Sequence, residues 1–222
     1  MQLCRRPPVG LAGELGLTIS DSKPGTRRMS LPRLLREISA CRICEAELPH
    51  GPRPILRASR SARLLIISQA PGSKVHQTGI PWNDASGKHL REWMDVDRSI
   101  FYDPAKVATV PMGFCYPGAA ATGGDKPPRP ECAPLWHERI LNQLPNLQLT
   151  LLVGQYAQKL YLGAGRKSSM TETVKAFAEY GPKLFPLPHP SWRSGVWMKR
   201  QPWFEEETIP WLRQLVQRAI KD

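Results

Sequence analysis

The sequence predicts an α/β fold of three layers, in which helices cover both faces of a central four-stranded parallel sheet. Short apolar runs of strand length alternate along the chain with segments that have the 3.6-residue period of amphipathic helices. The chain has 222 residues, 41% of them hydrophobic, which is enough to bury a core of that size. Such alternation is typical of βαβ units, whose parallel sheets are buried on both faces.

The folded part is expected to begin near residue 30. Residues 1–29 are rich in Pro, Gly, Arg and Ser and have no sustained apolar period, so we predict a disordered or adventitious basic extension, with Met29 as a candidate start. Ser30 can then cap an N-terminal helix that has Pro32 in its first turn. The predicted domain organisation is therefore an extension over 1–29 and an α/β domain over 30–222.

Four apolar runs are expected to form the sheet. The predicted strands are residues 63–68, 107–110, 149–153 and 183–187. The segments with helical periodicity are residues 86–94, 131–144, 155–162 and 209–220. In a parallel sheet the ligand lies beyond the carboxyl ends of the strands, so the chemistry should lie in residues 68–87, 112–132 and 188–199. No GxGxxG or Walker motif is found there, which argues against nicotinamide and ATP chemistry.

Charge and hydropathy narrow the class of protein. Lys and Arg total 31 against 19 Asp and Glu, a formal charge of +12 that favours polyanionic partners such as nucleic acid. The apolar runs are too short to cross a bilayer, and the opening residues do not have the pattern of a signal peptide. We therefore expect a cytoplasmic protein with no membrane partner.

Four cysteines form a pattern of their own. Cys41 and Cys44 make a CxxC segment, and Cys115 and Cys132 flank a Pro-rich stretch. Cysteines in a protein expected to be cytoplasmic argue against a disulfide framework and suggest metal ligation, with scattered buried thiols as the alternative. Four thiolates suit either a [4Fe-4S] cluster or a tetrahedral zinc ion, and the spacing does not separate the two.

Three motifs occur in a fixed order along the chain. The first is Ser-Gln-Ala-Pro-Gly at residues 68–72, followed by Gly-Ile-Pro-Trp at 79–82 and Asp-Ala-Ser-Gly at 84–87. The second is His-Pro-Ser at 189–191, and the third is the set of four cysteines. In this order they resemble the uracil-DNA glycosylase superfamily, most closely its iron-sulfur branches, over roughly residues 30–220. The resemblance favours the cluster over zinc.

The sequence departs from those branches at two positions. One branch has Glu where this chain has Gln69, whereas the other has an Asp just before Ser-Gly, which Asp84 reproduces. Both branches have an Asn that reads uracil, and its nearest match here is Asp125. The resemblance therefore leaves the identity of the target base open.

The resemblance implies a catalytic pair. Hydrolysis of an N-glycosidic bond needs a carboxylate that orients water or offsets charge on the sugar, for which we select Asp84. It also needs a donor to the departing base, for which we select His189. The competing structural interpretations are that Asp84 only caps the helix that follows it and that His189 is an interior histidine.

The same resemblance implies a base pocket and a DNA contact. Backbone groups of Gln69 and Ala70, the ring of Trp82 and the carboxyl group of Asp125 are predicted to bind the base, although Trp82 can equally be a core residue and Asp125 an exposed turn residue. The residues expected to contact DNA or fill the gap left by a flipped nucleotide are Ser191, Trp192 and Arg193.

These assignments predict a monomeric DNA glycosylase that removes uracil or another deaminated base by base flipping and water attack. Two rivals stay open. A nucleic-acid-binding protein of the same fold could keep the pocket without turnover, as the residues at 69 and 125 suggest. An iron-sulfur redox or sensor protein would explain the cysteines but gives no purpose to His189.

Overall fold

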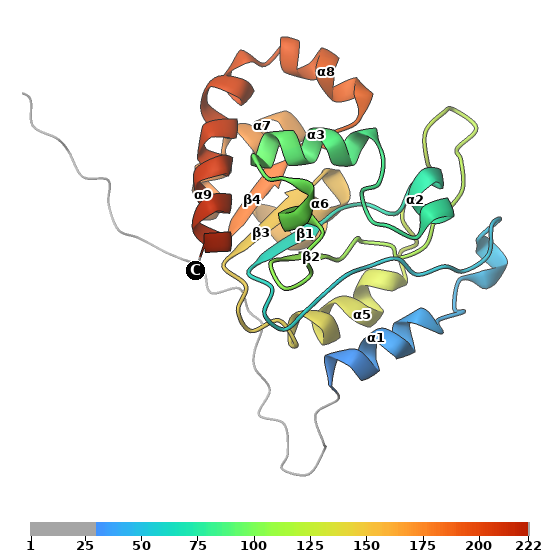
Figure 1. Cartoon of the computed structure of the whole chain (residues 1–222). Helices are drawn as coiled ribbons and strands as arrows, with labels where there is room; N and C mark the ends of the chain where they lie inside the picture. The colour runs from blue at the N-terminus through green and yellow to red at the C-terminus, as the bar shows by residue number, and fades with distance from the viewer. Residues whose placement is uncertain (1–29, 222) are drawn as a thin grey trace, which may run out of the picture.

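The computed structural model describes residues 30–221, which are arranged around one parallel sheet (Figure 1). Its strands are β1 (Leu64–Ile67), β2 (Val107–Thr109), β3 (Leu149–Val153) and β4 (Leu184–Leu187). Their order is β2-β1-β3-β4, and every neighbouring pair is parallel. The predicted four-stranded parallel sheet is confirmed.

Nine α-helices are present in the described part of the chain. They are α1 (Leu31–Ser39), α2 (Ser73–Thr78), α3 (Ala85–Met94), α4 (Arg98–Phe101), α5 (Cys132–Leu141), α6 (Gln155–Leu162), α7 (Met170–Lys175), α8 (Trp192–Lys199) and α9 (Ile209–Lys221). Three short 3₁₀ segments cover Glu45–Glu47, Gly163–Gly165 and Phe177–Tyr180, and a π-helical turn, Phe204–Thr208, runs directly into α9.

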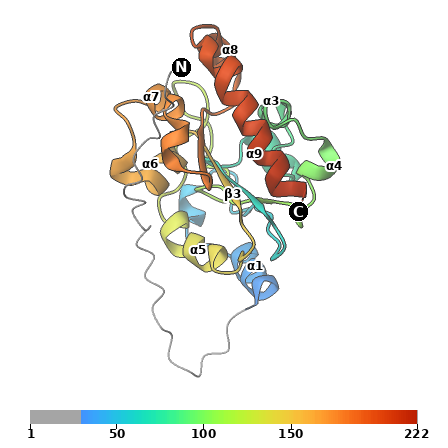
Figure 2. The same ribbon diagram turned by 90° about the vertical axis from the view of Figure 1, so that its left-hand side faces the viewer.

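The apolar residues of β1 divide the core into two halves. Leu64 and Ile66 belong to a cluster that includes residues of α3 and α9, whereas Leu65 and Ile67 belong to a second cluster with residues of α1 and α5. Successive side chains of a strand point to opposite faces of its sheet, so helices lie on both sides (Figures 1 and 2). The three-layer arrangement is therefore as predicted, and burial on both faces explains the uninterrupted apolar run of β1.

Several elements differ from the sequence prediction. The helices α2, α4, α7 and α8 were not expected. The first three have only four to six residues, too few turns to show a clear apolar period. The helix predicted over 131–144 ends at Leu141. Ser30 occupies the N-cap position of α1, but its side chain makes no capping hydrogen bond. The extension predicted over residues 1–29 lies outside the described residues.

No helix among residues 30–221 is both long enough and apolar enough to cross a bilayer.

Candidate active site

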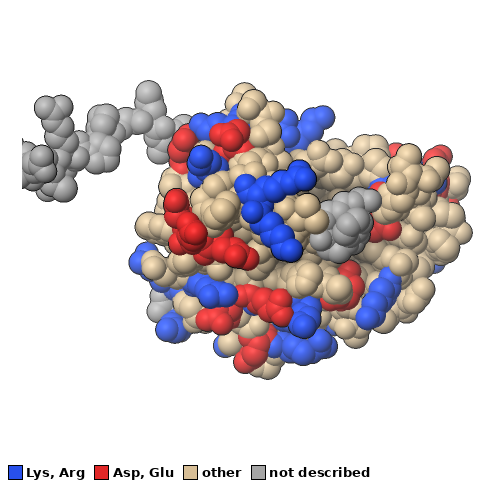
Figure 3. Space-filling model, turned by 90° about the horizontal axis from the view of Figure 1, so that it is seen from above, with Lys and Arg blue, Asp and Glu red and all other residues tan. Residues whose placement is uncertain are grey.

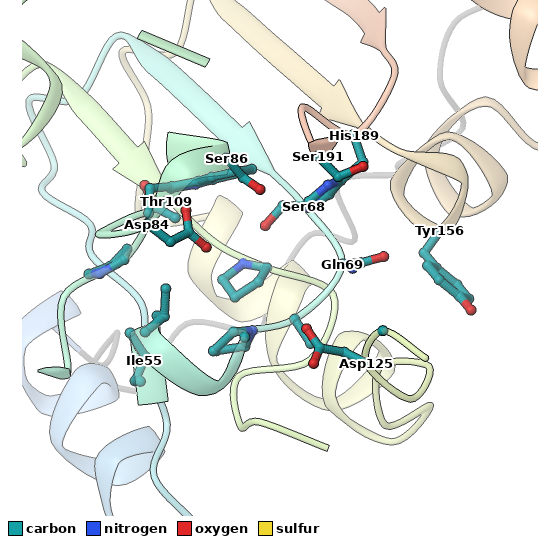
Figure 4. A pocket seen from close by; sticks show the side chains of 18 of the residues that line it. Ile55, Ser68, Gln69, Asp84, Ser86, Thr109, Asp125, Tyr156, His189 and Ser191 are labelled. Atoms are coloured by element: carbon teal, nitrogen blue, oxygen red, sulfur yellow. The ribbon is translucent and has the colours of Figure 1, made fainter. Parts of the chain in front are cut away.

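A cavity of about 440 Å³ opens at the carboxyl ends of the strands (Figure 4). Segments far apart in the sequence meet here: the turn after β1, the loop after β2, the start of α6 and the segment after β4. Seven residues selected from the sequence line it, namely Gln69, Ala70, Trp82, Asp84, Asp125, His189 and Ser191.

Backbone hydrogen bonds join the two loops that form the floor. The Met112 N–H donates to the carbonyl of Ser68 over 2.7 Å, and the Gly113 N–H donates to the carbonyl of Gln69 over 2.9 Å. Ser68 is itself buried at the end of β1. The turn that carries Gln69 and Ala70 is thus fixed to the loop after β2, so the position of these residues depends on the sheet rather than on local sequence.

The turn before α3 positions Asp84 by capping. Asp84 is the N-cap residue of α3, and its Oδ1 atom accepts the Gly87 N–H over 2.8 Å. Within the described residues no hydrogen bond engages its second carboxylate oxygen. Figure 4 shows the carboxyl group facing the cavity. Capping and a chemical role are therefore compatible, because each uses a different oxygen.

Trp82 is both a core residue and a wall of the cavity. It is 7% exposed and belongs to the core cluster that contains α3 and α9. Its φ of 58° lies in the left-handed region, which bulky residues rarely adopt. The Tyr102 hydroxyl donates to its carbonyl over 3.0 Å and helps to hold this conformation. Its ring stacks on His189, with centroids 5.8 Å apart and planes inclined by 27°.

His189 follows β4 and enters the cavity opposite Asp84 (Figure 4). Its carbonyl accepts hydrogen bonds from the Ser191 N–H and the Ser194 hydroxyl, which fix the backbone at this point. Burial lowers the pKa of the imidazole, and the Asp84 carboxylate opposes this only in part. The ring is therefore mainly neutral at neutral pH, so it carries one N–H that it can donate without adding a positive charge.

Asp125 reaches the cavity from a hairpin-like loop. Ala119 and Asp125 form an isolated antiparallel bridge, and the Ala120 N–H donates to the Gly124 carbonyl over 2.9 Å. The residue is exposed as a whole, but a Cβ placed on Gly72 would lie 3.3 Å from its Oδ2 atom. The loop therefore turns the carboxyl group toward the motif after β1.

The surroundings of Asp125 disfavour the ionised form of its carboxyl group. Desolvation raises the pKa of this carboxyl group, and the Asp84 carboxylate raises it further, whereas a hydrogen bond with Tyr116 acts in the opposite direction. The net pKa lies above the ordinary value of an aspartate. Two carboxyl groups thus face one cavity, and Asp125 is protonated more easily than an ordinary aspartate.

The predicted DNA-binding residues are only partly described. Ser191 lines the cavity and lies at the N-cap of α8. The side chains of Trp192 and Arg193 lie outside the part of the structure that can be described, so the wedge assigned to them stays a prediction. Seen from above, the surface carries blue and red patches side by side rather than one uniformly basic face (Figure 3).

The four cysteines come together away from this cavity. Cys41, Cys44, Cys115 and Cys132 are free thiols and line one small cavity between α1, α5 and the loop after β2. Burial, together with the charges of the neighbouring cysteines, raises the pKa of Cys115 to about 11 and that of Cys132 to about 12. Within residues 30–221 no group of three or more His, Cys, Asp and Glu is arranged so that it could hold a metal ion.

The structure adds residues that the sequence did not single out. Thr109, at the end of β2, and Gln155 and Tyr156, at the start of α6, also line the main cavity. Thr109 could have been found from its place at a predicted strand end, since all four strands end on this side. Nothing in the local sequence distinguishes Tyr156 from the other aromatic residues of the chain.

The arrangement of sheet, cavity and motifs defines an α/β protein with a ligand-sized cavity at its strand ends. Residues 57–213 match the model of the uracil DNA glycosylase superfamily. The match spans most of the chain and includes the motifs after β1 and β4. The chain therefore belongs to the uracil DNA glycosylase superfamily, a group of glycosylase-type hydrolases that act on DNA.

Proposed function

We propose that this protein is a DNA glycosylase that hydrolyses the N-glycosidic bond of uracil or another deaminated base. The observation that carries the proposal is that Asp84 and His189, distant in the sequence, line the same cavity. Its volume of about 440 Å³ lies within the range of small-ligand pockets and is large enough to admit a nucleobase. A base in a duplex must be extruded before it can enter such a site.

In the proposed reaction Asp84 orients a water molecule with the carboxylate oxygen that does not cap α3. The water oxygen forms a bond to C1′ of the sugar as the bond from C1′ to the base nitrogen breaks, and the proton of the water passes to the carboxylate. The bonding electron pair leaves with the base. The negative charge of the carboxylate also offsets the positive charge that develops on the sugar ring.

His189 acts on the other side of the bond. Because burial lowers its pKa, the imidazole is neutral and donates one N–H to the carbonyl oxygen on which the departing base accumulates negative charge. The stacked ring of Trp82 restricts the imidazole to one orientation. A donor fixed before the reaction stabilises the transition state without the cost of reorganisation.

Base recognition is assigned to the backbone of Gln69 and Ala70, the ring of Trp82 and the side chain of Asp125. An ionised Asp125 can only accept a hydrogen bond, for example from a ring N–H of the base. A protonated Asp125 can also donate to a carbonyl oxygen, and its raised pKa makes that form more accessible. The proposed substrates are therefore oxo-bases with a ring N–H beside a carbonyl group, such as uracil, hypoxanthine and xanthine.

We also propose a [4Fe-4S] cluster held by Cys41, Cys44, Cys115 and Cys132. The donor set fits, because these are free thiols around one cavity and such clusters are ligated by four cysteines. Zinc would require the sulfur atoms to converge to about 2.3 Å from one ion. The cluster is preferred over zinc because the sequence resembles the iron-sulfur branches of the superfamily. Its function here is to tie the N-terminal segment to the loop after β2.

The proposal is tested by incubating the protein with oligonucleotides that carry a single uracil, hypoxanthine or xanthine, followed by alkali to cleave abasic sites. We expect strand cleavage on at least one of the three, and much slower cleavage with the Asp84→Asn variant. Binding of these oligonucleotides without cleavage would instead favour the rival, a nucleic-acid-binding member of the family without turnover. The absence of both binding and cleavage would exclude either function.

A further inference from the structure

Three arginines surround the ring of Tyr102, beside the candidate active site. The guanidinium carbons of Arg57, Arg91 and Arg98 lie 5.7, 5.6 and 5.2 Å from the centroid of that ring. They come from the loop before β1, from α3 and from α4, respectively. The helices α3 and α4 lie on the same side of the molecule (Figure 2). We call these four residues the arginine cluster.

No ion pair within the described residues balances the positive charges of the arginine cluster. Among residues 30–221 none of the three arginines forms an ion pair with Asp or Glu, although other arginines of the chain do. Three like charges around one ring repel each other, while the cation–π contacts with Tyr102 act in the opposite direction. An anion bound beside the guanidinium groups would lower this repulsion.

The arginine cluster is bonded directly to the walls of the main cavity. The Arg91 guanidinium donates to the Tyr102 hydroxyl over 3.3 Å, and that hydroxyl donates to the carbonyl of Trp82. Arg57 exchanges two backbone hydrogen bonds with Thr109, of 2.7 and 2.9 Å. Trp82 and Thr109 both line the cavity. A molecule that fills the cavity and continues past Trp82 on this side would therefore meet the arginines.

We propose that the arginine cluster binds a backbone phosphate of the DNA strand whose target nucleotide occupies the cavity. This inference rests on the proposed function and adds to it the position at which the flanking strand is held. A nucleotide strand carries a phosphate at every residue, so a phosphate near the target nucleotide follows of necessity. Guanidinium groups match the geometry of phosphate oxygens and stack on aromatic rings at the same time.

Arg98 is the member that can test this contact with the least damage to the fold. Its residue is exposed, and its side chain makes no hydrogen bond within the described residues, whereas Arg57 and Arg91 are half-buried and donate to Tyr102. The control is Arg36→Gln, which removes the same charge from an exposed residue of α1. α1 packs in the other half of the core, on the opposite face of the sheet from α4.

The experiment measures the affinity of full-length protein for a uracil-containing duplex over a series of salt concentrations. We expect Arg98→Gln to weaken binding several-fold and to make the slope of log affinity against log salt less steep by about 0.9, the value for one phosphate contact. Arg36→Gln should leave the slope unchanged. An unchanged slope in Arg98→Gln, or an equal change in both variants, would overturn the proposal.

A second measurement locates the phosphate. Oligonucleotides with one phosphate replaced by a neutral methylphosphonate are bound to wild-type protein and to Arg98→Gln. At the contacted phosphate, the loss of affinity caused by the methylphosphonate and the loss caused by Arg98→Gln should not be additive. Additive losses at every position would contradict the proposal. This outcome can be distinguished from failure of the proposed function. If wild-type protein binds no DNA, the proposed function is wrong. If wild-type protein binds DNA but the losses of affinity are additive at every position, only the proposal about the arginine cluster is wrong. Preferential binding of an acidic peptide over DNA would assign the surface to a protein partner instead.

Discussion

Gly87 and the carbonyl group of Trp82 approach each other so closely that no side chain fits between them. A Cβ placed on Gly87 would lie 1.8 Å from the Trp82 oxygen and 2.8 Å from the Trp82 Cβ. The same glycine donates its N–H to Asp84. One residue of α3 therefore fixes both the wall of the cavity and the candidate catalytic carboxylate.

Gly87→Ala is expected to have a large effect on stability and activity, although it adds only one methyl group. Either α3 moves away from the turn or Trp82 leaves its left-handed conformation, and we expect a loss of about 3 kcal/mol in the free energy of unfolding, together with loss of glycosylase activity. Urea denaturation and the alkali-cleavage assay measure the two effects. The matched control is Gly165→Ala, where a Cβ would meet nothing within 4 Å. Equal stability of both variants would disprove the close contact.

Asp84→Asn separates the two functions of this residue. Asparagine retains an oxygen that can accept the Gly87 N–H, so the helix cap and the melting temperature should be preserved. Asparagine cannot take a proton from water, so the rate of cleavage should fall by about 10² to 10⁴. Single-turnover kinetics and DNA affinity are measured together, and affinity should be nearly unchanged. A normal rate would leave Asp84 as a capping residue only.

His189→Ala is expected to remove the donor to the departing base and to lower the single-turnover rate by about 10² to 10³. The ring also stacks on Trp82, so stability has to be measured alongside the rate. His189→Phe restores an aromatic ring without an N–H and serves as the control for packing. If His189→Phe were as active as wild type, the ring and not its N–H would be what the reaction needs.

The sequence predicted the sheet well because both faces of each strand are buried. The run Leu64–Ile67 is apolar throughout for that reason, and its own sequence is enough to predict a strand. Helix α4 was missed because four residues show no period, although it supplies Arg98 to the arginine cluster. The local pattern therefore predicts elements that are apolar throughout or span several turns, and it misses a short helix such as α4 that contains a charged residue.

The sequence identified residues of the candidate site but not the geometry in which they are arranged. Motif order selected residues such as Asp84, Asp125 and His189, and the fold brings all three to one cavity. No sequence pattern indicated that Tyr116 is hydrogen-bonded to Asp125 or that Trp82 has a positive φ. These features depend on how separate loops meet, which only the tertiary structure determines.

The cysteines allow a test by metal removal. Protein purified without oxygen should show the visible absorption of an iron-sulfur cluster, and Cys132→Ser should lose most of it. Loss of the cluster should also lower the melting temperature, because the thiols join residues near α1 to α5. Chelation of iron from the wild-type protein should reproduce the effect. Stoichiometric zinc in place of iron would contradict the cluster.

The raised pKa of Asp125 predicts how the rate of cleavage depends on pH. As the pH falls from neutral toward the acid side, Asp125 becomes protonated earlier than an ordinary aspartate and gains an O–H that can donate to a carbonyl oxygen of the base. Asp125→Asn carries an amide donor at every pH. The rate of wild type relative to Asp125→Asn on a uracil substrate should therefore rise as the pH is lowered, and fall as the carboxylate ionises and repels that carbonyl. A ratio of rates that does not change with pH would show that the protonation of Asp125 has no part in reading the base.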